Sequence, residues 1–151
     1  MSVSVSNKIS KIKLNIKKKE TPSPKVKLNI TKKGKTYSVN LSYQLFGKPL
    51  HEAPVVMINH ALTGNSNVAG ADGWWSSIVG HGKLIDTTFY TVLAFNIPGN
   101  GQDQNPSNLI DNYKDFTAGD IAQIFAIALN KLKITQLFAV IGGSVGGGLA
   151  W

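Results

Sequence analysis

A serine set between glycines, close to residue 151, is the side chain best placed to do chemistry. Residues 142–146 read Gly-Gly-Ser-Val-Gly, a G-x-S-x-G motif centred on Ser144. A serine hydroxyl is a poor nucleophile unless it is lifted clear of the backbone and placed beside a base. A sharp strand-to-helix turn lifts it, and small residues two before and two after the serine let strand and helix pass closely. The motif alone is common by chance, so its context has to separate a nucleophile from an ordinary Gly-rich loop.

The residues on either side of the motif favour the nucleophile. Leu137–Ile141 are apolar without interruption, which is typical of a short strand buried on both faces. A helix of about two turns is expected after Ser144, so the serine would lie at a helix N-terminus, where free N–H groups favour developing negative charge. We therefore interpret residues 142–146 as a nucleophile elbow with Ser144 as its nucleophile.

The elements that would position this serine follow an alternating pattern. Residues 54–59 and 90–96 read as buried strands, and a helix is predicted from Thr117, which forms a capping box with Asp120. The apolar stripe predicted for that helix is Ile121, Ile124, Phe125, Ala128 and Leu132. A short helix with its aromatic residues inward is expected at 73–80. The order strand, loop, strand, helix, strand, elbow predicts a parallel α/β fold.

The loop at residues 60–64, directly after the first of these strands, is where an acyl-transfer enzyme needs a second backbone N–H for an oxyanion. His60 lies in this loop, but enzymes with such an elbow place the triad in the order Ser, acid, His. A histidine before the serine is out of order, so a structural, hydrogen-bonding role is predicted for His60. His51 and His81 lack metal-like spacing and are interpreted as surface or loop residues.

The positive charge is concentrated at the N-terminus. The chain has 16 basic residues, all of them Lys, against 8 acidic ones. Eleven of the Lys and only one acid, Glu20, precede Tyr37. Residues 1–36 are therefore predicted to be a Lys-rich arm, partly disordered or contributing a first strand, and 37–151 the main domain. Residues 11–16 (KIKLNI) are nearly repeated at 25–30 (KVKLNI), and the second copy is expected to be the first strand, followed by a turn at 33–35 and a strand at 37–45.

The sequence gives no support for binding of nucleic acid, membrane or nucleotide. The arm has no Arg and no interleaved aromatic residues, so nucleic acid is not expected as a partner, although recruitment of an anionic partner stays open as an alternative. No apolar run is long enough to span a membrane, and Met1–Ser10 lack a signal peptide's apolar region, so we expect no membrane partner and a cytoplasmic location. Neither a P-loop nor a G-x-G-x-x-G motif fits, and the absence of Cys excludes disulfides and thiolate metal sites.

Five stretches of the chain, from about residue 37 onward, resemble the homoserine O-acetyltransferase family of the α/β-hydrolase fold. They are residues 41–47 (LSYQLFG), 59–65 (NHALTGN), 73–75 (GWW), 82–87 (GKLIDT) and 142–147 (GGSVGG). The resemblance implies the N-terminal part of an α/β-hydrolase domain, with a mostly parallel sheet and flanking helices, ending just after the nucleophile elbow. The triad Asp and His are then expected beyond residue 151.

The resemblance also implies a function. Members of this family transfer an acetyl group from acetyl-CoA through an acyl-serine to the hydroxyl of homoserine, in methionine biosynthesis. By motif position, Ser144 would be the nucleophile, and the backbone N–H groups of Leu62 and Val145 would form the oxyanion hole. No bound cofactor or metal is implied, acetyl-CoA being a co-substrate. The partners implied are these small molecules, with a homodimer allowed for the full-length protein.

The acyl donor and acceptor stay open. Residues 97–103 differ from the family's usual Thr-Gly-Pro run. The chain also has no Arg that could form a bidentate ion pair with the carboxylate of homoserine. An α/β-hydrolase esterase, or a transferase with another donor or acceptor, is therefore the alternative.

Overall fold

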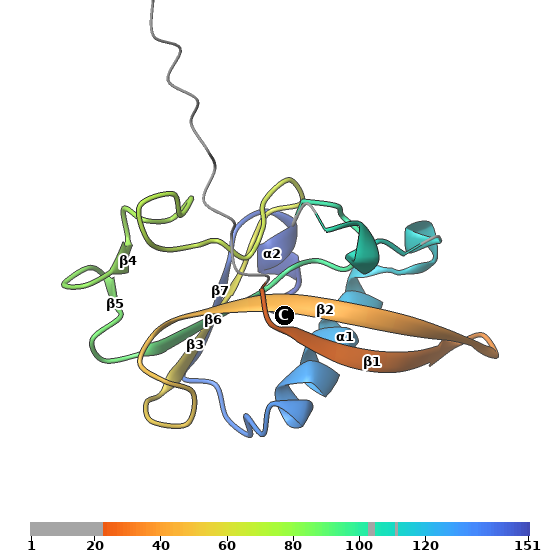
Figure 1. Ribbon diagram of the computed structural model, residues 1–151, viewed down its shortest axis with the longest axis horizontal. Helices are drawn as coiled ribbons and strands as arrows, with labels where there is room; N and C mark the ends of the chain where they lie inside the picture. Colours follow the sequence, from red (N-terminus) through yellow and green to blue (C-terminus); the bar gives the residue numbers. More distant parts are fainter. Residues whose placement is uncertain (1–22, 103–104, 111) are drawn as a thin grey trace, which may run out of the picture.

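The computed structural model describes residues 23–102, 105–110 and 112–151, so the first repeat copy at 11–16 lies outside the described residues. A five-stranded sheet with the order β1-β2-β6-β3-β7 forms the centre of the molecule (Figure 1). Its strands are β1 (Lys25–Lys32), β2 (Lys35–Gly47), β3 (Val55–Asn59), β6 (Thr91–Phe95) and β7 (Ala139–Gly142). The remaining elements are β4 (Val79–Gly80), β5 (Ile85–Asp86), the 3-10 turns η1 (Pro106–Asn108) and η2 (Tyr113–Asp115), and the helices α1 (Ala118–Lys131) and α2 (Val145–Gly148).

The predicted first hairpin is confirmed, and it is longer than expected. β1 and β2 pair antiparallel from Lys25 opposite Ser42 to Lys32 opposite Lys35, around a turn at 33–34. Along β1 the aliphatic residues Val26 and Leu28 are buried while the lysines between them are exposed, because successive side chains of a strand point to opposite faces. Residues 25–36 of the predicted arm thus belong to the sheet.

The three strands that lead to the predicted site are parallel. β3 pairs with β6 on one side and with β7 on the other. All residues of β3 and β6 are buried, whereas β7 is only half-buried throughout. The prediction that the strand at 137–141 is buried on both faces is therefore wrong for the described residues. β7 is paired there on one side only, and Phe138, just before it, is 63% exposed.

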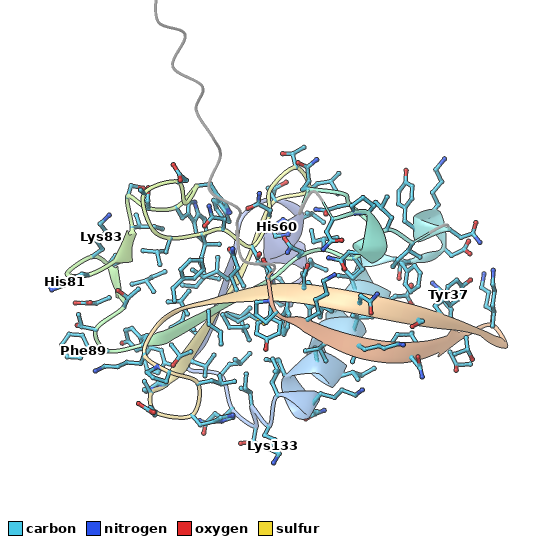
Figure 2. All side chains as sticks on the ribbon, in the orientation of Figure 1. Tyr37, His60, His81, Lys83, Phe89 and Lys133 are labelled. Atoms are coloured by element: carbon cyan, nitrogen blue, oxygen red, sulfur yellow. The ribbon has the colours of Figure 1, made fainter. Side chains whose placement is uncertain are left out.

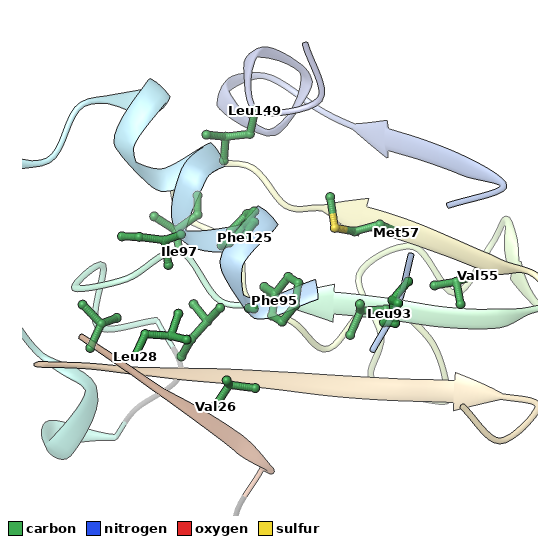
Figure 3. Close-up of a cluster of buried hydrophobic side chains, with 14 residues drawn as sticks. Val26, Leu28, Val55, Met57, Leu93, Phe95, Ile97, Phe125 and Leu149 are labelled. Atoms are coloured by element: carbon green, nitrogen blue, oxygen red, sulfur yellow. The ribbon is translucent and has the colours of Figure 1, made fainter. Parts of the chain in front are cut away.

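Two apolar clusters cover the two faces of the sheet, because β3 and β6 send alternate side chains to each. On one face, Phe125 of α1 stacks on Phe95 of β6 with 5.1 Å between ring centroids (Figure 3). On the other face, Val56 and Ile58 pack under the loop layer that contains β4 and β5. The capping box between Thr117 and Asp120 at the start of α1 is present as predicted. Of the predicted apolar stripe, α1 buries Ile124, Phe125 and Ala128 in the core.

The helix predicted at 73–80 does not form. The segment is a series of turns ending in β4, and Trp74 is 38% exposed with its indole N–H donating to Asn65 O at 2.9 Å. Bulky, β-branched and serine side chains have weak helix propensity, and Gly73 and Gly80 at the two ends weaken it further. Val79–Gly80 instead pair with β5 as a short parallel bridge. Trp75 does point inward, against the second cluster.

Candidate active site

Ser144 lies in a strained turn between β7 and α2. Its backbone angles are φ 55° and ψ −125°, in a region that non-glycine residues rarely adopt. Such a conformation costs on the order of 1–3 kcal/mol and persists only where the surrounding structure imposes it. The side chain is exposed and makes no capping hydrogen bond to α2. The turn therefore presents the hydroxyl outward, as a nucleophile elbow does.

The two outer glycines of the motif have no room for a side chain. A Cβ on Gly142 would lie 2.6 Å from Gly147 N and closer still to Gly146 O. A Cβ on Gly146 would lie 2.7 Å from His60 O and closer still to Asn59 O. Strand and helix can pass at this separation only because both positions are glycine, which is the reason predicted from the motif.

The helix after Ser144 is shorter than predicted. α2 is a single turn, Val145–Gly148, with Gly147 N–H donating to Ser144 O at 3.0 Å. A single helical turn has only a small macrodipole. The dipole of α2 therefore adds little to the stabilisation of a negative charge at Ser144. The local N–H groups remain, because Val145 is the first helical residue and its N–H has no acceptor within the helix.

The loop after β3 is a tight turn whose carbonyl groups are held inward. Gly64 N–H donates to Ala61 O at 2.9 Å, and His60 Nδ1 lies 2.6 Å from the same oxygen. In a planar trans peptide the N–H points away from the C=O, so fixing Ala61 O directs Leu62 N–H to the opposite side. The Leu62 side chain is 61% exposed at the tip of this turn.

His60, labelled in Figure 2, is fully buried, and both of its ring nitrogens have hydrogen-bond partners. Ile97 N–H donates to Nε2 at 3.1 Å, which leaves Nδ1 as the protonated nitrogen that donates to Ala61 O. Burial lowers the pKa of His60, although the bond to Ala61 O acts in the opposite direction. His60 is thus a neutral structural residue, as predicted from its place in the sequence, and not a base for Ser144.

The elbow and the turn lie side by side. β3 and β7 are neighbouring parallel strands with Asn59 opposite Gly142, so the loops that follow them share one edge of the sheet. Gly143 N–H donates to Asn59 O at 3.4 Å, and Gly146 packs on the backbone of residues 59–60. Ligand sites of open α/β sheets form at this edge, outside the carboxyl ends of the strands.

A base for Ser144 is absent from the residues described. His51 precedes β3 at the opposite edge of the sheet, and His81 lies between β4 and β5 at the periphery (Figure 2).

Within the described ranges, no three His, Asp or Glu side chains form a metal-binding group. The same residues include no helix long and apolar enough to cross a membrane.

Sequence reasoning missed the amide side chains around the turn. Asn100 Nδ2 donates to Leu62 O and to Gly64 O, each at 3.3 Å. Asn96, only 4% exposed, donates to the hydroxyls of Ser42 and Ser66. The sequence does show two Asn residues just after the strand at 90–96. Only the strand order reveals that this strand lies beside β3, so that its loop meets the turn at 61–64.

The partly parallel sheet and the strained turn between β7 and α2 together define an α/β fold with an elbow at the carboxyl edge of its sheet. Residues 54–151 match the model of the alpha/beta hydrolase fold family, and the chain belongs to that family. The predicted resemblance to homoserine O-acetyltransferases is also confirmed. A homoserine O-acetyltransferase from Desulfotalea psychrophila is 35% identical over 147 residues, covering 85% of this chain and 37% of its own. A homoserine O-succinyltransferase from Magnetococcus marinus is 35% identical over 128 residues, covering 74% and 32%.

Solved structures agree with this assignment. The homoserine O-acetyltransferase from Bacillus anthracis superposes with a TM-score of 0.72 at 30% identity, over 84% of this chain and 41% of that one. Esterase E22 superposes with a TM-score of 0.67 at 27% identity, over 82% and 40%. The chain spans about a third of the length of the curated relatives it matches.

Proposed function

We propose that the full-length protein is an acyltransferase in which Ser144 carries the acyl group. The observation that supports this most strongly is the strained φ of Ser144 between two glycines that admit no side chain. A strained backbone held by close packing is characteristic of functional positions. The exposed hydroxyl also shares its edge of the sheet with a turn suited to hold an oxyanion.

The proposed roles follow from the positions of the groups. The Ser144 hydroxyl loses its proton to a base and its oxygen attacks the acyl carbonyl carbon of a thioester. The resulting oxyanion accepts hydrogen bonds from the N–H groups of Leu62 and Val145. The C–S bond then breaks, the thiol leaves with a proton, and an acyl-serine remains for attack by the acceptor hydroxyl. Because His60 is engaged elsewhere, we propose that the base and its orienting acid lie beyond residue 151 in the full-length protein.

For the substrates we propose acetyl-CoA and homoserine, which would place the reaction in methionine biosynthesis. The support is the likeness to proteins named homoserine O-acetyltransferase, one at 35% identity and one with a superposed structure. Succinyl-CoA is the alternative donor, because a homoserine O-succinyltransferase is equally similar. The cytoplasmic location, the homodimer and the domain boundary at 36/37 stay predictions.

Hydrolysis is the second candidate, favoured by the likeness to esterase E22. The same elbow serves an esterase when water replaces the acceptor hydroxyl. The two functions separate in one assay on the full-length protein: thiol release from acetyl-CoA with and without homoserine. A transferase releases thiol in step with O-acetylhomoserine, whereas an esterase forms acetate at a rate independent of homoserine. Ser144→Ala should abolish either activity, and Ser77→Ala, at another exposed serine, should leave it unchanged.

A further inference from the structure

Two loops at the carboxyl edge of the sheet are joined by asparagine side chains. One loop follows β3 and contains the turn at 61–64, and the other follows β6 at residues 96–102. Asn100 bridges them by donating to Leu62 O and Gly64 O, each at 3.3 Å, while its Oδ1 accepts from Gln102 N–H at 3.1 Å. Asn65 adds a longer link from its Nδ2 to Gln102 O at 3.5 Å.

The base of this arrangement is rigid. Asn96 at the end of β6 is buried and accepts from Ser66 N–H at 2.7 Å through Oδ1. Its Nδ2 donates to Ser42 Oγ at 2.9 Å and Ser66 Oγ at 3.0 Å. A buried and satisfied network of this kind fixes the relative position of the elements it joins, here β2, β6 and the loop after β3. Asn100, four residues further on, therefore extends from a fixed support.

The turn itself depends on Asn100 for its position. Its internal bonds, from His60 Nδ1 and Gly64 N–H to Ala61 O, set the plane of the peptide that carries Leu62 N–H. The next peptide plane, with Leu62 O, is held by Asn100. Leu62 and Thr63 are exposed, so packing does little to hold the tip of the turn. Without Asn100 the turn would keep its shape but lose the two bonds that tie its outer half to the β6 loop.

We propose that Asn100 is a positioning residue for the oxyanion hole, holding Leu62 N–H in place by hydrogen bonds to the carbonyl groups on the far side of the turn. This inference rests on the proposed function, because it takes the Leu62 N–H as an oxyanion donor. Removing a whole donor of this kind costs about 10²–10³ in rate. Misplacing one should cost a part of that, roughly tenfold or more, without weakening the binding of the acyl donor.

The test compares Asn100→Asp with Asn100→Ala in the full-length protein. Aspartate keeps the shape of Asn and the acceptor for Gln102 N–H, but it loses both donor bonds and sets a carboxylate against two carbonyl oxygens. The matched control is Asn67→Ala, which removes a bond from the same loop to Asp72 O, away from the turn. The measurements are the rate of Ser144 acylation by acetyl-CoA, the KM for acetyl-CoA and the melting temperature.

The positioning role predicts that both Asn100 variants acylate roughly tenfold or more slowly, with KM and melting temperature close to those of Asn67→Ala. If Asn100→Asp acylates as fast as the wild type while Asn100→Ala is slow, Asn100 only builds its own turn and the inference is overturned. It is equally overturned if both variants match the wild type. If the wild type is never acylated on Ser144, the failure lies in the proposed function instead.

Discussion

Gly146 offers the sharpest test of how the elbow is packed. A methyl group there would lie 2.7 Å from His60 O, whereas ordinary van der Waals contact begins at 3.4 Å. The neighbouring atoms are backbone, so either α2 or the end of β3 must move by about 0.7 Å or more. Forcing an extra carbon into a packed site typically costs about 1–3 kcal/mol. Gly146→Ala should therefore destabilise the protein.

Gly148 provides a matched control in the same helical turn. A Cβ at Gly148 meets nothing within 4 Å. Alanine is favoured over glycine inside a helix by about 1 kcal/mol, and both variants share this gain. The difference between them then reports the clash alone, so we expect Gly146→Ala to be about 1–3 kcal/mol less stable than Gly148→Ala. Urea denaturation of the full-length protein measures this difference.

The same shift should reach the chemistry. Moving the backbone of residues 59–60 moves the turn that carries Leu62, and displacements near 1 Å can cost up to about 100-fold in rate. Gly146→Ala should therefore acylate at least about tenfold more slowly than Gly148→Ala. Equal stability and equal rates for the two variants would refute the close packing of α2 on the end of β3, and with it the geometry proposed for the site.

Two further predictions concern pH. Lys32 Nζ forms an ion pair with the Asp120 carboxylate, which also accepts from the hydroxyl and N–H of Thr117. These contacts, that of Lys32 above all, hold the pKa of Asp120 well below its ordinary value of 3.8. The stability that this carboxylate adds is therefore complete above that pH and is lost as pH falls below it. Urea melts should show the wild type losing its advantage over Asp120→Asn as pH drops below about 4, and a constant difference would contradict the ion pair. Because burial lowers the pKa of His60 below 6.5, the unfolded chain takes up a proton that the folded one does not, and stability should fall as pH drops below about 6.5. His60→Gln should lose this part of the slope, and identical slopes would show that the folded imidazole titrates normally.

Local patterns were enough to predict the elements that lead to the site. Runs of apolar residues identified β3 and β6, and the capping box identified the start of α1, because each signal is local and strong. The G-x-S-x-G motif identified the elbow because its glycines answer a steric demand that any such turn makes. The structural role of His60 was predicted from chain order alone, because a triad histidine should follow the serine, whereas its neutral state is known only from its burial and hydrogen bonds.

Two kinds of feature were not predicted correctly, one local and one that depends on contacts between distant segments. The helix expected at 73–80 was wrong for a local reason, because its bulky, β-branched and serine side chains between two glycines have weak helix propensity, and the segment folds as turns that end in β4. The strand before Ser144 was expected to be buried on both faces and is only half-buried. Among the described residues it pairs with β3 alone, and its own sequence does not specify how many strands lie beside it. Asn100 was missed because nothing in its local sequence indicates that β6 lies beside β3 and that their loops meet.

The most direct test of the central claim is to trap the acyl-enzyme. The full-length protein is mixed with acetyl-CoA without an acceptor, quenched in acid and digested, and its peptides are analysed by mass spectrometry. The account predicts an acetyl group on Ser144 that disappears when homoserine is added before the quench. An acetyl group on another residue, or product formation with Ser144 never acylated, would contradict it.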